Sequence, residues 1–561
     1  MSVRASDYPP PFDAADYVAE PTDPADERIE VGVLIVGAGP AGLACAIRLG
    51  QLLGEHPDVA ERLGEVPVAV VEKGKQPGSH LLSGAVVNPR ALRKLGFRPE
   101  DVPNYGEVHE EAVYVLTKRA ALRIPPPPTM RNHGNWIMSL SQLGRFLAEQ
   151  AEEGGAMVLP ETAAERLLVS HGRVVGIRTG DKGRNREGEP MGNYEPGSDL
   201  VARVTVLAEG TQGHLTGVAL DRFGLRSEEP QVWELGVKEV WRVPRAPRHV
   251  IHTMGWPLRT SAKYREFGGS FIYPMGDDML TIGMVVGLDY RDAELSTHDV
   301  LQELKTHPKI AKLLRGGERI GWGAKTIPSG GWYSLPSKLH APGLLLCGDG
   351  VGMVNIPRLK GVHYAIESGR LAAESAFAAL RRGATPSTAL QSYDDGVRNG
   401  FIGADLHEVR DMRQVFGRGF FVGGALASAM TVSRGRIDFG KMRAEPDAEQ
   451  PLLTTNRAAS YPAPDGKVTF DKLSSVFASG NKTRDDQPNH IRIERRVPKE
   501  VAEMWVNLCP AQVYEIGTEG SDGTVTVNVA ASNCVQCGAI TAKGGRLTPP
   551  EGGSGPEYQL T

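Results

Sequence analysis

The sequence predicts an α/β fold built around a nucleotide-binding domain with a doubly wound parallel sheet, whose segments are separated along the chain. Three observations predict it. A β-branched run at 31–36 opens into a glycine-rich turn and a helical pattern, and two later apolar runs each end in an acidic residue beside a glycine. After about residue 460 the pattern changes to short strands and turns with clustered cysteines. A chain of 561 residues is long enough for several domains with cores of their own.

The composition of the chain argues against several classes of function. The formal charge of −4 and the absence of an extended Lys/Arg stripe argue against a nucleic-acid partner. Five cysteines in so long a chain are too few for a disulfide framework and indicate a reducing compartment. Residues 1–30 are acidic and contain prolines, which predicts a disordered or draped arm without the character of a transit peptide. No apolar run reaches the about 18 to 20 residues of a membrane span, so we expect any membrane contact to be peripheral.

The glycine-rich turn has the features of a dinucleotide site. Gly37 permits a tight turn, Gly39 lets the backbone approach a pyrophosphate, and Gly42 lets the helix pack closely on the strand. The N-terminus of the following helix offers oriented N–H donors to a phosphate. A second apolar strand at 66–71 ends at Glu72, an acid placed to bond a ribose hydroxyl. The alternative is a glycine turn of some other α/β protein, but the carboxylate favours FAD or NAD over NADP.

Two later strands favour FAD, the longer ligand. The run ARVTVLAE leads to Glu209 and Gly210, in the position where two-part flavoproteins return to the nucleotide. The run LLLCGDG leads to Gly348 and Asp349, and an Asp there can bond the ribityl chain or approach the pyrophosphate. Three separated returns to one nucleotide therefore predict FAD as the cofactor.

Three further residues near these motifs have a structural alternative to a functional role. Cys45 lies in the first helix and Cys347 in a strand, and we expect both to be small core residues, because free cysteine is among the most buried residue types. His363 precedes a helix able to favour negative charge near a flavin. A hydrogen-bonded core histidine is an equal interpretation of His363.

Beyond these motifs the chain resembles one family, electron transfer flavoprotein–ubiquinone oxidoreductase, a membrane-associated flavoprotein that passes electrons from electron transfer flavoprotein to quinone. The resemblance extends from about residue 30 to 558. It is carried by VEKGKQPGSHLLSGAVVNPRAL, RNHGNWIMSLSQLGRFL, LAEGTQGHL, HTMGWPL, GGSFIYPM, VVGLDY, GDGVGMVNIPRLKGVHYAIESGRLAAE, PDGKVTFDKLSSVFASG, DDQPNHI, CPAQVYE and PPEGGSGPEY. The resemblance implies FAD, one iron–sulfur cluster, ubiquinone as substrate and a flavoprotein as electron donor.

The resemblance also implies the domain organisation. We expect a two-part FAD-binding Rossmann-type domain, an inserted β-sheet quinone domain and a C-terminal ferredoxin-like α+β unit. The predicted bounds are 1–30 for the arm, 31–215 plus 340–400 for the FAD-binding domain, 216–339 for the quinone domain, 401–460 for an interfacial helical segment and 461–561 for the ferredoxin-like unit.

Two segments are candidates for a membrane surface, which a quinone-reducing chain must reach. Residues 120–130 hold four consecutive prolines, which favour an extended form. Residues 417–436 have an apolar core of about a dozen residues with arginines at its ends, which suits a helix lying in the interface or an ordinary buried helix. The family places its membrane-contacting hairpin, here near 112–136, and its helix at these positions.

The family also indicates where the quinone lies. Its stretch near the quinone pocket includes Gly268, Gly269 and Tyr273 of this chain. The sequence assigns none of the three an individual role.

The C-terminal cysteines are one short of the family's cluster. The family holds a [4Fe–4S] cluster with four cysteines, one in a CPAxVYE motif and three in a CxxCxxC run. This chain has Cys509, Cys534 and Cys537, and Ile540 stands where the fourth is expected. Four alternatives stay open: a [4Fe–4S] cluster with a non-thiolate fourth ligand, a three-iron cluster, an empty vestige, and a thioredoxin-like pair. The preserved spacing favours some cluster over a vestige.

The leading functional hypothesis is a quinone-reducing flavoprotein peripheral to the cytoplasmic face of a bacterial inner membrane. No nucleophile–base pair stands out, which suits an enzyme whose chemistry belongs to its cofactors. One alternative is an FAD-dependent reductase or hydroxylase of a lipid-like substrate that uses NAD(P)H. Another is a membrane-surface flavoprotein without turnover.

Overall fold

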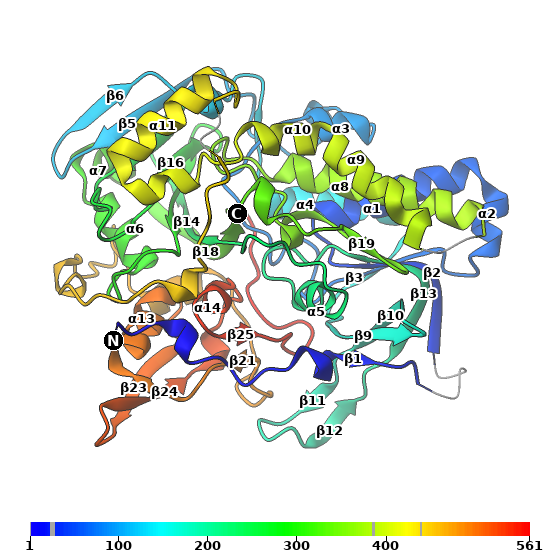
Figure 1. Cartoon of the computed structure of the whole chain (residues 1–561). Helices are drawn as coiled ribbons and strands as arrows, with labels where there is room; N and C mark the ends of the chain where they lie inside the picture. Colours follow the sequence, from blue (N-terminus) through cyan, green and yellow to red (C-terminus); the bar gives the residue numbers. More distant parts are fainter. Residues whose placement is uncertain (1, 23–27, 384–386, 438–439) are drawn as a thin grey trace.

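The computed structural model of the protein describes residues 2–22, 28–383, 387–437 and 440–561. Two large sheets stand side by side, one under the long helices α1 and α8 and the other flanked by the helix α11 (Figure 1). The C-terminal residues, orange to red in Figure 1, form a third unit next to the start of the chain. The nucleotide-binding motifs belong to the first of these sheets.

The first sheet has nine strands, and its central strands are parallel. Its strands, in spatial order, are β1 (Val18–Ala19), β9 (Ala164–Ser170), β10 (Arg173–Thr179), β13 (Asp199–Leu207), β2 (Arg28–Val36), β3 (Val68–Val71) and β8 (Met157–Leu159), with β20 (Leu344–Leu346) on β13 and β19 (His340–Ala341) on β20. Helices cover the sheet, so a central strand is buried on both faces and consists of a continuous apolar run. Val33, Leu34 and Ile35 of β2 illustrate this, because none of them is exposed.

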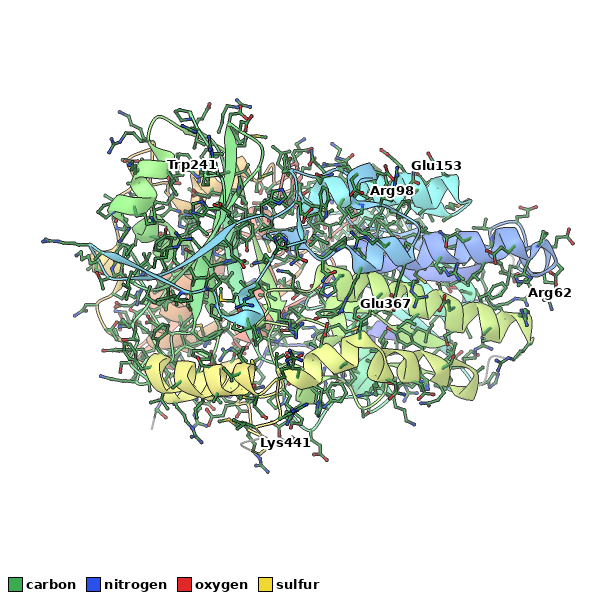
Figure 2. The ribbon with its side chains drawn as sticks, turned by 90° about the horizontal axis from the view of Figure 1, so that it is seen from above. Arg62, Arg98, Glu153, Trp241, Glu367 and Lys441 are labelled. Atoms are coloured by element: carbon green, nitrogen blue, oxygen red, sulfur yellow. The ribbon has the colours of Figure 1, made fainter. Side chains whose placement is uncertain are left out.

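Helices α1 (Pro40–Glu55) and α8 (Val362–Arg381) approach each other at backbone distance. A Cβ atom on Gly369 of α8 would lie 1.9 Å from the carbonyl oxygen of Ala41 in α1. Glu367 of α8, labelled in Figure 2, is buried and accepts a hydrogen bond from Lys94 of α3 (Arg90–Lys94) at 2.6 Å. This packing fixes the N-terminal ends of both helices relative to the sheet.

The second sheet has seven strands. They are, in spatial order, β18 (Glu318–Pro328), β14 (Trp233–Arg242), β17 (Met279–Gly287), β16 (Gly268–Pro274), β15 (Val250–Gly255), β5 (Glu111–Leu116) and β6 (Ala121–Ile124). The hairpin β5–β6 lies inside the segment predicted as part of the FAD-binding domain, yet β5 pairs in parallel with β15 and so extends this sheet. The predicted domain boundary is therefore wrong for this hairpin, because its hydrogen bonds to β15 make it part of the second sheet.

The C-terminal unit shares a hydrophobic core with the second sheet. Its elements are α12 (Lys472–Ala478), β21 (Ile491–Arg492), β22 (Arg496–Pro498), α13 (Lys499–Leu508), β23 (Tyr514–Glu519), β24 (Thr524–Val529), α14 (Ala539–Ala542) and β25 (Arg546–Leu547). Trp505 of α13 and Trp322 of β18 are both buried in that core. The unit is therefore packed against the second sheet and does not form a core of its own.

Shorter elements connect these bodies. They are β4 (Val86–Val87), β7 (Trp136–Ile137), β11 (Lys182–Arg184), β12 (Pro190–Glu195), α2 (Pro57–Arg62), α3 (Arg90–Lys94), α4 (Leu140–Glu153), α5 (His214–Arg222), α6 (Thr297–Lys305), α7 (Pro308–Leu314), α9 (Gln391–Asn399), α10 (Phe401–Glu408) and α11 (Phe420–Val432). In the described part of the N-terminal arm, Ala5 is buried and β1 pairs with β9, so residues 2–22 are draped over the protein. Within the described residues, no helix is both long and apolar enough to cross a membrane.

A single added methyl group should distinguish the close helix contact from an open one. We expect Gly369→Ala to lower the free energy of unfolding by about 1 to 3 kcal/mol, because its Cβ would meet backbone that cannot move aside. Gly54→Ala in α1 is the matched control, since nothing lies within 4 Å of a Cβ there. The control should be neutral or stabilising by up to about 1 kcal/mol. Urea unfolding measures both, and equal effects would contradict the packing argument.

Candidate functional site

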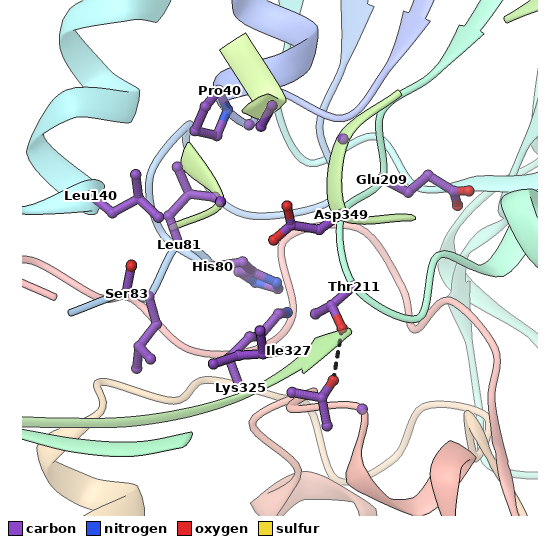
Figure 3. A pocket seen from close by; sticks show the side chains of 18 of the residues that line it. Pro40, His80, Leu81, Ser83, Leu140, Glu209, Thr211, Lys325, Ile327 and Asp349 are labelled. Carbon is purple, nitrogen blue, oxygen red and sulfur yellow. Dashed lines mark hydrogen bonds between the residues drawn. The ribbon is translucent and has the colours of Figure 1, made fainter. Parts of the chain in front are cut away.

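A cavity of about 320 Å³ lies where the two sheets and the C-terminal unit meet. Its wall includes the glycine turn after β2, strands β14, β17 and β18 of the second sheet, and the loop that holds Cys534 and Cys537. Figure 3 shows side chains from these separate segments pointing toward one space. The predicted nucleotide residues therefore border a cavity that the rest of the chain completes.

The glycine turn closes one end of the cavity. Gly37 has a φ of +105°, and a Cβ there would lie 2.4 Å from the carbonyl oxygen of Ala208, so only glycine fits the crossing. Gly39 is the N-cap of α1, whose first N–H groups have no partners within the helix. A Cβ on Gly42 would lie 2.0 Å from the carbonyl oxygen of Gly37. Gly37 and Gly39 thus lie in the cavity wall, and Gly42 lies where the helix packs on the turn.

Glu72 follows β3 and lines the cavity beside this turn. Its Oε2 accepts a hydrogen bond from the Ala38 N–H at 3.0 Å, and its Oε1 accepts one from the Gly74 N–H at 2.7 Å. These bonds hold the carboxylate against the start of α1 with lone pairs left to accept more hydrogen bonds. The position suits recognition of a ribose hydroxyl.

Glu209 also lines the cavity, but its carboxylate serves a helix. It accepts hydrogen bonds from the Leu215 N–H at 3.1 Å, the Thr216 N–H at 2.6 Å and the Thr216 hydroxyl at 2.7 Å. These donors belong to the first turn of α5, so Glu209 caps that helix. In Figure 3 its side chain points away from the cavity centre. The backbone around Glu209 and Gly210 is what borders the cavity.

Asp349 points into the cavity from the third of the chain segments predicted to reach the nucleotide (Figure 3). Burial raises the pKa of its carboxyl to about 6. The preceding Gly348 has a φ of +68°, and its N–H donates to the Ser368 hydroxyl of α8 at 3.1 Å. A hydrogen bond from a donor such as a ribityl hydroxyl would stabilise a buried carboxyl of this kind.

Several buried polar groups in the cavity wall have no hydrogen-bond partner among the described residues. They include both ring nitrogens of His80, both ring nitrogens of His490, the side-chain amide nitrogen of Gln212, and the Nδ1 atoms of His214 and His363. Buried polar groups are nearly always paired, so these atoms call for a ligand rich in hydroxyl and phosphate oxygens. The residues present therefore fit FAD. The sequence pattern did not single out His80, His490 or Gln212, since no local periodicity distinguishes them.

The second sheet contributes a different set of groups. The Tyr273 hydroxyl lies 2.8 Å from Nε2 of His252, and Lys238 Nζ donates to the carbonyl oxygen of Ser83 at 2.8 Å. Tyr273 and Lys238 line the cavity. Gly268 and Gly269, predicted near the quinone, lie in the same strand as Tyr273, but the lining residues do not include them. A Cβ on either glycine would meet neighbouring backbone, so both are needed for strand packing.

Two residues at the start of α8 separate the cavity from a second one. Lys360 and His363 line both spaces. His363 is buried, its Nε2 lies 3.4 Å from Nη2 of Arg90, and its Nδ1 has no hydrogen-bond partner within the described residues. The N-terminus of α8 directs its N–H groups toward this end of the cavity.

The cysteine loop forms another wall. Lys73 Nζ donates to Oε1 of Gln536 at 2.6 Å, and Lys325 Nζ donates to its carbonyl oxygen at 3.2 Å. The carbonyl of Cys537 accepts from the Thr326 N–H at 2.8 Å. Thr326 in turn lies 2.9 Å from Thr211, hydroxyl to hydroxyl (Figure 3). These bonds tie the loop to β18 and to the nucleotide segment.

The three cysteines of the C-terminal unit are gathered near one another, and burial raises the pKa of each thiol. Cys509 accepts a hydrogen bond from the Ala511 N–H at 3.5 Å, and Cys534 accepts one from the Gln536 N–H at 3.4 Å. Ile540 is 4% exposed and packs in the shared core. Within the described residues, no three His, Cys, Asp or Glu side chains are close enough to hold a single metal ion. Cys45 and Cys347 are buried in the other core, as expected.

The two acidic residues should respond differently to truncation. We expect Glu72→Ala to weaken FAD binding about 10- to 100-fold, because the ribose would lose a charged hydrogen-bond acceptor. We expect Glu209→Ala to lower the free energy of unfolding by about 1 to 2 kcal/mol through the lost helix cap. Fluorescence titration with FAD and urea unfolding measure the two effects. A larger loss of FAD affinity in Glu209→Ala than in Glu72→Ala would contradict these assignments.

Comparison with solved structures supports the fold. A geranylgeranyl bacteriochlorophyll reductase-like protein from Thermoplasma acidophilum superposes with a TM-score of 0.55 at 17% identity, over 74% of this chain and 94% of that protein. The flavin-dependent brominase Bmp2 superposes with a TM-score of 0.50 at 17% identity, over 72% of this chain and 93% of the other. The predicted α/β fold class is confirmed, and identities this low show the fold alone.

Sequence comparisons are more specific. Residues 233–327 match the family model "ETF-QO, ubiquinone-binding", and residues 466–559 match "Electron transfer flavoprotein-ubiquinone oxidoreductase, 4Fe-4S". The mitochondrial electron transfer flavoprotein–ubiquinone oxidoreductase of Arabidopsis thaliana is 38% identical over 95% of this chain and 85% of its own length. The Pseudomonas aeruginosa protein of the same name is 38% identical over 95% of this chain and 99% of its own. The chain therefore belongs to the electron transfer flavoprotein–ubiquinone oxidoreductase family.

Proposed function

We propose that this chain passes electrons from reduced electron transfer flavoprotein, through bound FAD, to ubiquinone at a membrane surface. One observation carries the proposal beyond family membership. The cavity that begins at the glycine turn continues to Tyr273, Val285 and Ile327, which all lie within the segment that matches the ubiquinone-binding model. A nucleotide and a quinone could therefore occupy one continuous space, which would bring them close enough for direct electron transfer.

FAD would supply the redox chemistry, because a flavin can accept electrons one at a time and give up two. We assign FAD binding to residues of the three chain segments that are predicted to reach the nucleotide, through the hydrogen-bonding atoms described above. The assigned residues are Gly37, Gly39, Gly42, Glu72, Glu209, Gly210, Gly348 and Asp349. Within this set, Glu72 and Asp349 present carboxylates to the ligand, while Glu209 acts through its backbone and by capping α5.

Quinone reduction consumes two protons as well as two electrons, and the cavity wall holds groups able to supply protons. Burial lowers the pKa of Lys238 and of Lys360 to about 7, so each Nζ exchanges its proton near neutral pH. Both ammonium groups line the cavity. We assign Tyr273, with its hydroxyl held by His252, to the quinone region.

The route to the membrane follows from exposed apolar side chains. Phe421 and Val432 of α11 are 74% and 83% exposed, and Leu122 of β6 is 67% exposed. α11 also contacts the turn Pro128–Met130 that follows the hairpin. Large exposed apolar side chains on a helix and a hairpin suit insertion into the interface of a bilayer.

We propose the side of the membrane on which the chain lies from the state of its cysteines and from its relatives. All five cysteines are unpaired in the structure, which suits a reducing compartment. Relatives of this family occur in Pseudomonas aeruginosa and Acinetobacter baylyi. We therefore place the chain at the cytoplasmic face of a bacterial inner membrane.

The residues present do not fit a [4Fe–4S] cluster held by four cysteines. The segment that matches the 4Fe–4S model contains Cys509, Cys534 and Cys537 only. Cys45 and Cys347 belong to the core of the other domain. The side chain of Ile540 packs against Ile493 and Gly545 and offers no donor atom. The electron route proposed above therefore includes no cluster.

Direct turnover tests the proposal. In anaerobic stopped-flow experiments, reduced electron transfer flavoprotein should reduce the bound FAD, and a short-chain ubiquinone should reoxidise it, with turnover in the range of about 1 to 10³ s⁻¹ typical of enzymes. NADH and NADPH should leave the FAD oxidised. Rapid reduction by NADH or NADPH would instead favour a reductase or hydroxylase, and tight FAD without turnover by any donor would favour a non-enzymatic flavoprotein.

Iron analysis tests the ligand count. We expect no more than about three iron atoms per FAD in the natural chain, because a four-iron cluster normally takes four thiolates. Ile540→Cys restores a CxxCxxC run and should raise iron and acid-labile sulfide toward about four per FAD. Ile540→Ala, which removes the side chain without adding a thiol, is the control. Four irons in the natural chain, with the spectrum of Ile540→Cys, would show that another group completes the site.

A further inference from the structure

A second cavity, of about 280 Å³, lies beside the first and shares Lys360 and His363 with it. Its wall comes from five separated segments: residues 88–90, the turn Pro128–Met130 and the residues after it, residues 358–364, the end of α10, and the C-terminal end of α11 with the residues that follow it. The family models that match this chain cover 233–327 and 466–559, and so leave these segments outside.

Cations outnumber carboxylates in this wall by five to two. Arg90 is paired with Asp405, and Arg358 with Glu408 at 2.7 Å. The three remaining cations are Arg131, Lys360 and Arg434. None of these three has an ion pair with a carboxylate within the described residues. The cavity therefore carries an uncompensated positive charge.

Some buried polar atoms of the residues in this wall also lack hydrogen-bond partners among the described residues. The Nε atoms of Arg90 and Arg358 are buried and have no hydrogen-bond partner among the described residues. The buried His363, which shares this wall, has an unpartnered Nδ1. The Arg90 guanidinium lies 3.5 Å from the ring centroid of Phe401, which holds it in place. Unpartnered guanidinium donors around excess positive charge suit a phosphate group, which accepts several charge-assisted hydrogen bonds.

The position of the cavity indicates where such a phosphate comes from. One of its walls is the end of α11, which carries exposed apolar side chains, and another is the turn Pro128–Met130, which follows the hairpin with the exposed Leu122 and contacts α11. A phosphate bound here lies next to the surface proposed to enter the bilayer interface. We propose that this cavity binds the phosphate of an anionic membrane lipid, a proposal that rests on the membrane contact within the proposed function.

Arginines on the same segment provide a matched comparison. Arg434 lines the cavity, whereas Arg436, two residues later, and Arg418, before α11, do not. All three are basic residues near one surface, so nonspecific attraction to an anionic membrane would involve each of them about equally. Specific binding of a phosphate in the cavity would depend on Arg434 and on Arg131, which line its wall, and not on Arg418 or Arg436.

Vesicle sedimentation of the FAD-loaded full chain tests the proposal. The vesicles consist of phosphatidylcholine alone or of phosphatidylcholine and phosphatidylglycerol in equal parts. The pocket variant is Arg131→Gln with Arg434→Gln, and the control is Arg418→Gln with Arg436→Gln, which removes the same charge. FAD content and thermal unfolding verify that both variants fold.

We expect phosphatidylglycerol to strengthen binding of the natural chain. The increase in affinity that phosphatidylglycerol causes should fall by at least about tenfold more in the pocket variant than in the control. A difference of this size exceeds the one expected from surface charge alone. Equal losses in the two variants, or displacement by millimolar inorganic phosphate without any preference for phosphatidylglycerol, would overturn the lipid assignment. Equal binding to both vesicles would contradict this proposal alone, whereas no binding to either would contradict the membrane contact as well.

Discussion

The backbone contact between α1 and α8 is the constraint on which the site depends. Gly369 faces the carbonyl of Ala41, and the resulting approach leaves no room for a side chain between the helices. Because the helices cannot slide apart, their N-termini stay at fixed places along one cavity. The start of α1 borders the cavity at the glycine turn, and the start of α8 borders it where the nucleotide sheet meets the second sheet. Both ends offer unsatisfied N–H groups to an anionic ligand.

The second organising feature is strand β18. Thr326 binds the carbonyl of Cys537 and contacts Thr211, and the neighbouring Lys325 binds the carbonyl of Gln536. One short stretch of strand thereby joins the nucleotide segment, the quinone segment and the cysteine loop. The shared hydrophobic core under this strand reinforces the junction. Loss of a cluster ligand at Ile540 is compatible with such a unit, since an aliphatic side chain at that position adds to the core that already supports the loop.

Local patterns predicted the parts of the site that depend on short-range geometry. The positive φ of Gly37 and the tight packing of Gly42 follow from a strand, a turn and a helix adjacent in sequence. The direction of the Glu209 carboxylate could not be predicted in this way, because it depends on α5 beginning where its N–H groups meet that side chain. His80 and His490 could not be predicted as site residues for the same reason. Segments far apart in the chain bring them to one cavity.

The sequence by itself determined the class of cofactor, the family and the number of thiolates available to the C-terminal unit. These depend on residue identity and short spacings. Tertiary structure decided that the hairpin β5–β6 joins the second sheet, that Glu72 and Asp349 rather than Glu209 present carboxylates to the cavity, and that five segments enclose a cationic cavity near the exposed helix. The physical reason is that strand pairing and cavity walls are set by contacts between residues far apart in sequence, which no local periodicity records.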